Sequence, residues 1–309
     1  MSRVDFVVAE EEAGERLDAV LAARVGLPSR AAAQRLIDAG AVSVDGQSRA
    51  KSFRVSAGER VLLEEQPEAP PDASQVPYEV VFEDEELLVV DKPAGVVVHP
   101  APGYRGPTLA EALRERAGGG PAGRRGIVHR LDRDTSGLLV VAKSERTYAA
   151  LQRMIRARKV RRTYLALVSG SPDAGEGTID APLGRDRVRR TVVSTRTDKA
   201  RGAVTHFRVL ERLGRTSLLE VRLETGRTHQ IRAHLAAIGH PVCGDRRYGG
   251  GACGIRLGLE RQFLHSAELM FRHPTAREVV RCESKPPVDL RRALDAARRE
   301  PVSGGPDGG

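Results

Sequence analysis

The residues best suited to chemistry lie in one short stretch, Gly126–Ser144, with the sequence GIVHRLDRDTSGLLVVAKS. Its second half, Leu138–Ala142, is an apolar run rich in β-branched residues, which predicts a buried strand. Directly before this strand the sequence places Asp132 and Asp134 among arginines. An isolated charge is costly to bury, so charges at the end of a buried strand must be paired or reach solvent. The stretch therefore predicts either a structural ion pair or a carboxylate held rigidly at the edge of a cleft.

The spacing of the two aspartates leaves three kinds of chemistry open. Side chains two residues apart in an extended chain point to the same side. Asp132 and Asp134 are therefore candidates for a metal clamp, an acid/base pair, or a nucleophile beside a structural carboxylate. Arg130 and Arg133 flank Asp132, and neighbouring cations compete with a metal ion for a carboxylate. The arginines favour an ionised aspartate that attacks an electrophilic carbon.

The run HRLDRDTSGLLVVAKS resembles the signature of the Rlu-type pseudouridine synthases, which isomerise uridine in ribosomal or transfer RNA. The resemblance implies that Asp132, directly after His-Arg-Leu, is the nucleophile. Two further motifs, RTYLA and TGRTHQIR, follow in the expected order. In the family the tyrosine of the first, here Tyr164, lines the active site, and the last arginine of the second, here Arg232, pairs with the nucleophile. The motifs also supply the residues expected to bind substrate: His129, Arg130, Arg133, Thr135, Arg162, Arg227, Thr228, His229 and Gln230.

The reaction that the resemblance implies breaks the bond between uracil N1 and ribose C1′, turns the ring and rejoins it through C5. A base inside a helix is inaccessible, so it must be flipped out. We expect Asp132 to act at C1′ and Arg232 to hold it ionised. Tyr164 is expected to pack on the uracil and help remove the C5 proton, and Arg130 to fill the gap left by the base. Attack on the sugar, attack on the base and a glycal route stay open, and no cofactor or metal is required.

The composition predicts a folded protein with a polyanionic partner. The 309 residues are 40% apolar and 29% charged, with a formal net charge of +9 and a pI of about 9.9. Such a basic balance favours nucleic acid first and an acidic membrane second. No stretch approaches the roughly 20 apolar residues of a membrane span, and the N-terminus lacks the apolar core of a signal peptide. We therefore expect a cytoplasmic protein without a membrane partner and, by default, a monomer.

The cysteines and histidines predict neither cross-links nor a metal site. Cys243, Cys253 and Cys282 form no C-x-x-C pair and are odd in number, so a disulfide framework is not expected. The spacing of His234, His240 and Cys243 matches no common pattern of zinc ligands.

Residues 1–65 predict a small separate module. Its basic side chains gather between Arg24 and Arg60, seven against three acidic ones, although the module as a whole carries a net charge of −2. The runs ERLDAVLA and PSRAAAQRLIDAGAVSVDG resemble the small α/β RNA-binding module shared by a small-subunit ribosomal protein and some tRNA synthetases. That module lays its second helix on structured RNA, which implies RNA contacts by Ser29, Arg30, Arg35 and Lys51. The expected elements are helices at 15–23 and 30–40, the second capped by Ser29, and strands at 42–44 and 60–63.

The rest of the chain predicts a proline-rich linker at 66–77, a catalytic domain at 78–298 and a disordered tail at 299–309. Short strands with few helices predict an α+β fold, in which a mixed, mostly antiparallel central sheet carries flanking helices. This is the pseudouridine synthase fold that the resemblance implies, beside the N-terminal α/β module. The expected strands lie within 78–90 and at 96–99, 138–142, 160–168, 203–210 and 218–223. The expected helices lie at 108–116, 145–159 and 229–238, the last capped by Thr228, and beyond Pro287.

Two basic segments are candidate RNA contacts. Six of the ten residues from Arg153 to Arg162 are basic, more than the capping of a helix C-terminus needs. Residues 185–201 carry seven basic and two acidic side chains and predict a β-hairpin, either a clamp on the RNA backbone or a mobile loop.

The sequence as a whole predicts an RNA pseudouridine synthase, with large-subunit ribosomal RNA favoured over transfer RNA as its substrate. Two other functions stay open. One is a non-catalytic RNA-binding factor of ribosome assembly on the same scaffold. The other is a metal-dependent nuclease that uses Asp132 and Asp134.

Overall fold

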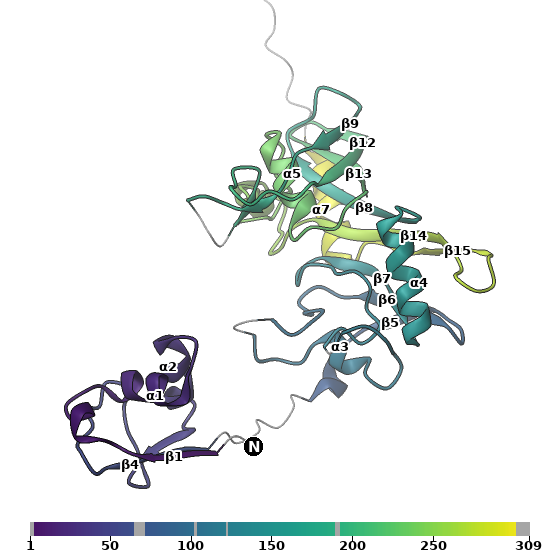
Figure 1. Cartoon of the computed structure of the whole chain (residues 1–309). Coiled ribbons are helices and arrows are strands. Elements are labelled where there is room, and N and C mark those ends of the chain that lie inside the picture. Colours follow the sequence, from purple (N-terminus) through teal and green to yellow (C-terminus); the bar gives the residue numbers. More distant parts are fainter. Residues whose placement is uncertain (1–2, 65–71, 102–103, 122, 189–191, 301–309) are drawn as a thin grey trace, which may run out of the picture. The chain divides into compact units, whose positions relative to one another are not determined.

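The computed structural model describes residues 3–64, 72–101, 104–121, 123–188 and 192–300. The chain divides into two compact units, Met1–Pro71 and Asp72–Gly309, which are described separately below (Figure 1). Among the described residues, no helix is both long enough and apolar enough to span a bilayer.

The smaller unit combines two helices with a four-stranded antiparallel sheet in the order β1–β4–β2–β3. Its elements are β1 (Arg3–Val7), the 3-10 helix η1 (Glu10–Glu12), α1 (Leu17–Val25), α2 (Arg30–Asp38), β2 (Val42–Val44), β3 (Gln47–Ser48) and β4 (Arg60–Glu64). The predicted helix cap is present, because Ser29 Oγ accepts a hydrogen bond from the Ala32 N–H at 3.3 Å. Both predicted helices form, whereas β1 and the short β3 are absent from the sequence prediction.

One carboxylate, Asp18, holds the two helices of the smaller unit together from inside. Its side chain is fully buried and accepts two hydrogen bonds from each of Arg16 and Arg30, at 3.0–3.3 Å, and one from Gln34 at 2.7 Å. These bonds, those of Arg16 foremost, keep the pKa of Asp18 far below its usual range. A buried charge is tolerated here because every side of it meets a donor.

Two of the residues expected to bind RNA already have partners within the smaller unit. Arg30 is bound to Asp18, and Lys51 Nζ lies 2.9 Å from Asp38 Oδ2 on the surface. Arg35 is exposed on α2. A phosphate that approaches Arg30 or Lys51 therefore competes with an existing ion pair.

Replacing Asp18 by asparagine keeps the shape of the side chain and removes the charge that both arginines bind. We expect Asp18→Asn to lower the free energy of unfolding of the smaller unit by about 2 kcal/mol, the usual scale for hydrogen bonds to charged groups. Hydrogen exchange of the α2 amides in the full-length protein measures this loss. The control is Asp38→Asn, which disrupts an exposed pair and should cost less than about 0.5 kcal/mol. Equal losses in both variants would contradict the role given to Asp18.

The larger unit is built on a nine-stranded sheet in the order β5–β6–β7–β14–β8–β13–β12–β9, with β15 paired to β14. Strands β7 and β14 pair in parallel, and the other pairs described in this sheet are antiparallel. The predicted mixed, mostly antiparallel sheet is therefore confirmed. The strands are β5 (Glu79–Glu83), β6 (Leu87–Lys92), β7 (Ser136–Ala142), β8 (Val160–Ser169), β9 (Glu176–Asp180), β12 (Val204–Leu213), β13 (Thr216–Leu223), β14 (Leu264–Arg272) and β15 (Val279–Glu283). The helices are η2 (Ala73–Gln75), α3 (Leu109–Ala112), α4 (Glu145–Arg156), α5 (Gln230–Ala237), α6 (Gly251–Arg256) and α7 (Val288–Arg299).

Strand β7 lies in the interior of this sheet, between β6 and β14, and is buried on both faces. Leu138 and Val140 pack in a core that includes Leu151 of α4, whereas Leu139 and Val141 pack in the larger core on the opposite face. Double burial explains why this strand is a continuous apolar run rather than an alternating one. At its start, a Cβ on Gly137 would lie 2.3 Å from Ser266 O, so only glycine allows β7 and β14 to pair this closely.

Several predicted elements are wrong in detail. Residues 96–99 form no strand, and the predicted helix 108–116 is reduced to the short α3. In the predicted linker, residues 65–71 lie outside the described part, but Val76 is buried in the core of the larger unit. Strands β9, β14 and β15 are not anticipated by the sequence analysis. The predicted disordered tail begins too early, because Arg299 is still part of α7, and residues 301–309 lie outside the described part.

The predicted basic hairpin also differs from its expectation. The strand signal at 203–210 belongs to the main sheet as β12, where it pairs with β9 and β13. The hairpin is instead a separate two-stranded ribbon of β10 (Gly184–Arg185) and β11 (Val193–Ser194). We call the described residues on either side of this ribbon, 184–188 and 192–194, the basic hairpin.

Candidate active site

The loop that carries Asp132 is a tight turn directly before β7. The Thr135 N–H donates to Asp132 O at 3.1 Å, which closes the turn. Asp132 and Asp134 are therefore not presented by an extended chain, as the sequence analysis assumed. Asp132 is largely buried, whereas Asp134 is 46% exposed and lies 3.7 Å from Arg133 Nε. The turn therefore places Asp132 toward the protein interior and leaves Asp134 half exposed, so the two carboxylates do not act as a pair.

A buried lysine fixes this turn from behind. Lys92 is fully buried, and its Nζ donates to Pro93 O at 2.7 Å, Val96 O at 3.0 Å and Arg133 O at 2.9 Å. Burial lowers the pKa of Lys92 to about 7. Because the lysine draws the carbonyls of Pro93 and Val96 toward one point, residues 93–96 form a turn. This explains why the strand expected at 96–99 does not form.

The carboxylate of Asp132 is held by a buried arginine that binds two aspartates. Arg232 Nη1 lies 3.0 Å from Asp132 Oδ2, as the family resemblance implies. The other edge of the same guanidinium binds Asp245, with Nε at 2.6 Å and Nη2 at 2.9 Å. Burial alone would lower the pKa of Arg232, but the hydrogen bonds that it donates to Asp245 and the charges of both aspartates raise this pKa above its usual value. Arg232 is thus a permanent cation with one nitrogen directed at Asp132.

Helix α5 places Arg232 through an unusual start. His229, at the N-cap position, has φ of +54° in the left-handed region and makes no side-chain cap bond. Thr228, which the sequence analysis assigned as the cap, is exposed. Gln230 instead holds the chain that leads into the helix, because its side chain accepts from the Arg227 N–H at 3.0 Å and donates to Val204 O at 3.0 Å. The turn is therefore tied to the sheet at β12.

Tyr164 forms another wall of the same cleft. It lies on β8 opposite Ser266 of β14 and is 4% exposed. Burial raises the pKa of Tyr164 more than the nearby Arg162 and the hydrogen bond with Ser266 lower it. The phenol is therefore neutral near pH 7 and is suited to packing against a planar base rather than to taking a proton as an anion.

The structure brings eight of the predicted catalytic and substrate-binding residues into one cleft. They are Arg130, Asp132, Thr135, Tyr164, Arg227, His229, Gln230 and Arg232, with Leu131, Leu223, Ile231 and Leu264 as apolar walls. Four predicted residues do not line it. His129 is buried beneath β7, Arg162 is buried with Nη2 3.4 Å from Leu223 O, and Arg133 and Thr228 are exposed.

Two residues that the sequence analysis missed complete the site. Asp245 is 1% exposed and Tyr248 stacks its ring 5.1 Å from the guanidinium carbon of Arg232. Both lie in the run GDRRYGG after α5, where charge and glycine together indicate only an exposed loop. A disulfide between Cys243 and Cys253 closes this loop, so the expectation of no disulfide is wrong. The two cysteines are ten residues apart and no motif marks them as partners.

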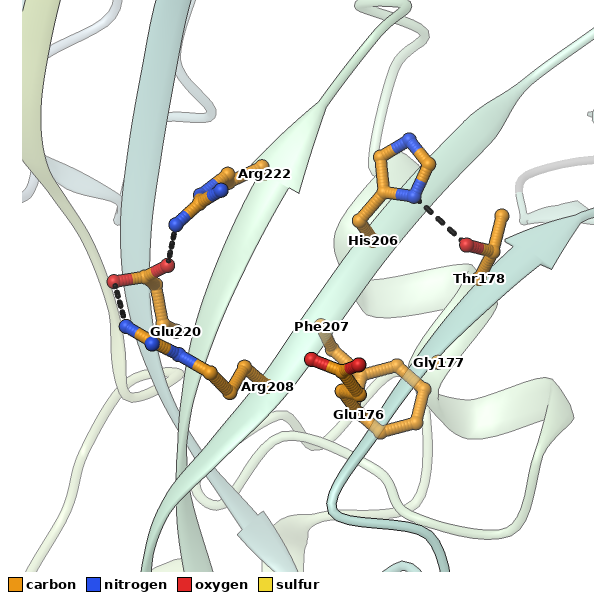
Figure 2. Close-up of a pocket in the computed structure, with 8 residues that line it drawn as sticks. All are labelled: Glu176, Gly177, Thr178, His206, Phe207, Arg208, Glu220 and Arg222. Carbon is orange, nitrogen blue, oxygen red and sulfur yellow. Dashed lines mark hydrogen bonds and ion pairs between the residues drawn. The ribbon is translucent and has the colours of Figure 1, made fainter.

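A second hollow, on the face of β9, β12 and β13, is distinct from this cleft (Figure 2). Both of its arginines are bound to Glu220, Arg208 at 3.1 Å and Arg222 at 2.5 Å. His206 Nδ1 lies 2.8 Å from Thr178 Oγ1. Its charges are therefore largely satisfied by each other. In the described part of the chain, no group of three His, Cys, Asp or Glu side chains is placed to hold a metal ion.

Comparison with known proteins assigns the family. A family model described as RNA pseudouridylate synthase matches residues 86–237, and one described as S4 domain matches residues 15–61. An uncharacterised RNA pseudouridine synthase of Mycobacterium tuberculosis is 44% identical over 298 residues, which cover 93% of this chain and 96% of that protein. The chain belongs to the RNA pseudouridine synthase family. It is therefore an isomerase that converts uridine to pseudouridine in RNA, and the resemblance noted from its motifs is confirmed.

Further relatives agree with this assignment of the synthase. The ribosomal large subunit pseudouridine synthase D of Xanthomonas campestris is 42% identical over 309 residues, covering 95% of this chain and 92% of that one. Among solved structures, human RNA pseudouridylate synthase domain containing 4 matches with a TM-score of 0.57 and 25% identity, over 71% of this chain and 93% of its own. The fold of the synthase is thus that of its family.

His129 of the synthase makes its stability sensitive to acid. The side chain is buried, Nε2 accepts from the Val140 N–H at 3.1 Å, and burial lowers its pKa to about 3. Between this value and the ordinary one near 6.5, the unfolded chain binds a proton that the folded chain excludes, so stability falls as pH falls. Between pH 7 and pH 5 we expect the free energy of unfolding to fall by about 2 kcal/mol less in His129→Gln than in wild type. Urea unfolding at both pH values measures the difference, and an unchanged slope would contradict it.

Proposed function

We propose that the synthase modifies uridines in large-subunit ribosomal RNA, with Asp132 as the catalytic carboxylate. The observation that carries the catalytic assignment is the contact of Asp132 with Arg232 in a cleft also lined by Tyr164. The substrate is supported by the relatives named ribosomal large subunit pseudouridine synthase D, which are 40–42% identical over at least 94% of this chain.

In this mechanism Asp132 acts on the target nucleotide after the base has left its stack. The bond from N1 to C1′ breaks, the uracil turns, and C5 bonds to C1′ while the C5 proton is lost and N1 gains one. Asp132 compensates the positive charge that develops at C1′, either by direct bonding or as an anion. Arg232 keeps it ionised and fixes its orientation. Tyr164 packs on the uracil, and the exposed Arg130 fills the gap that the flipped base leaves.

The phosphate backbone is expected to follow exposed cations on the larger unit. Arg153, Arg156 and Lys159 are exposed at and beyond the end of α4. Their positions at a helix C-terminus are favoured by the helix dipole without any ligand. Two neighbours are less available, since Arg158 lies 2.5 Å from Glu224 and Arg162 is buried. Fewer residues are therefore available to contact RNA phosphates than the basic run in the sequence suggests.

The replacement Asp132→Asn keeps the shape of the side chain and removes its charge. We expect it to abolish tritium release from RNA labelled at uracil C5, to below about one per cent of wild type, and to leave RNA affinity within about threefold. Asp134→Asn is the matched control, because Asp134 lies in the same turn and points to solvent. It should retain activity within about threefold. Substantial release by Asp132→Asn would rule out the assigned role.

The choice of RNA and the rival functions are decided in the same assay. Release from deproteinised large-subunit ribosomal RNA but not from tRNA supports the proposed substrate, and the reverse pattern favours tRNA. Cleavage of the labelled RNA without tritium release, abolished by a chelator, would support a metal-dependent nuclease. No release from any RNA, together with tight binding, would favour a non-catalytic factor of ribosome assembly.

A further inference from the structure

The basic hairpin is an ordered ribbon in its described part. Asp186 organises its first turn, because its N–H donates to Val192 O at 2.8 Å and its carboxylate accepts from the Val188 N–H and from Ser194 Oγ at 2.9 and 2.7 Å. Arg185 is exposed on β10, directly across from Val193 on β11. The ribbon thus presents a cation at a defined position.

The base of this hairpin packs against the helix that carries Arg232. Leu183, directly before β10, lies in a small apolar cluster with Ala203 and with Ala233 of α5. Val193 and Tyr248 pack against the same cluster. Ala233 is the neighbour of Arg232 on α5. The same helix therefore holds Arg232 and packs against the base of the hairpin.

The side chain of Tyr248 contacts both the catalytic pair and the hairpin, the first with its ring and the second with its hydroxyl. Its ring lies 5.1 Å from the guanidinium carbon of Arg232 and edge-on to His229, with ring centroids 5.7 Å apart. Its hydroxyl accepts from the Val193 N–H at 3.3 Å, lies 3.0 Å from Val193 O and lies 3.0 Å from His229 Nδ1. His229 Nε2 in turn lies 4.0 Å from Asp132 Oδ2. A continuous path of contacts therefore runs from β11 to Asp132.

A single hydroxyl proton cannot serve both of its neighbours. It is donated either to Val193 O or to His229 Nδ1, and His229 must then supply the complementary donor or acceptor. The position of β11 and the orientation of His229 beside Asp132 are thus linked through one atom. A tyrosine used only to fill space would not need its hydroxyl at this junction.

We propose that Tyr248 is a positioning residue that couples the basic hairpin to the catalytic pair of Asp132 and Arg232. Its ring supports Arg232, and its hydroxyl fixes the hairpin and His229 relative to Asp132. This inference rests on the proposed function, since it assigns the hairpin to RNA and Asp132 to catalysis. RNA held by the hairpin is thereby held in register with the cleft.

The variant Tyr248→Phe separates the two portions, because it keeps the ring against Arg232 and removes the hydroxyl. We expect kcat to fall about tenfold, KM to rise severalfold and the melting temperature to stay close to that of wild type. Trypsin should cut the hairpin several times faster than in wild type, because β11 loses its anchor. Tyr148→Phe is the control, since it removes a phenol hydroxyl from a different core and should change neither readout.

A double-mutant cycle tests the coupling itself. Arg185→Gln should raise KM in wild type and have a clearly smaller effect in the Tyr248→Phe background, because the released hairpin no longer aligns RNA with the cleft. If Tyr248→Phe misfolds, Val193→Pro removes the N–H that Tyr248 accepts and should give the same trypsin sensitivity.

Wild-type turnover and hairpin protection in Tyr248→Phe would overturn the inference and leave the proposed function intact. Additive effects in the cycle would likewise overturn it. Failure of the proposed function has a different signature, because wild type itself would then release no tritium. Trypsin cleavage of the hairpin does not depend on activity and tests the structural link in either case.

Discussion

A single buried guanidinium with two carboxylates sets the requirements for the rest of the larger unit. Burying Arg232 is tolerable only because Asp245 takes one edge of its fork and Asp132 the remaining nitrogen. Three segments far apart in sequence must therefore meet: the turn before β7, helix α5 and the loop closed by the disulfide. Loss of any one of them leaves a buried charge without its partner, so assembly of the fold and assembly of the site coincide.

The turn that carries Asp132 is rigid for reasons that lie behind it. Lys92 and the Gly95 N–H both bind Arg133 O, and Arg261 Nη1 binds Asp134 O at 3.0 Å. Strand β7 follows, with both faces buried, so the turn cannot relax in that direction either. A carboxylate held by such a rigid backbone has little orientational freedom left to lose when a substrate binds. This kind of preorganisation favours catalysis.

The sequence predicted what depends on local pattern and on motifs. Leu138–Ala142 had to be a buried strand, Ser29 had to cap a helix, and the motifs implied the meeting of Asp132 with Arg232. It did not predict Asp245, whose partner lies across a turn, or the strand β14, whose register depends on the close approach at Gly137. The sequence also suggested that Asp132 and Asp134 lie in an extended segment with their side chains on one side. They lie in a tight turn instead, and nothing in the local sequence shows that the distant Lys92 holds the backbone of this turn.

The charges around Asp132 differ in sign between the floor and the rim of the cleft. Two carboxylates and one guanidinium give the cleft floor a net negative charge, and burial lowers the pKa of His229, so this histidine adds no positive charge near neutral pH. A phosphate is repelled from such a floor, whereas a ribose carbon that becomes positive is attracted to it. Arg130 and Arg227 stand around this floor and offer the opposite sign. If Asp132 acts on the target nucleotide as proposed, these charges favour entry of the nucleoside into the cleft and keep the phosphate backbone of the RNA at its rim.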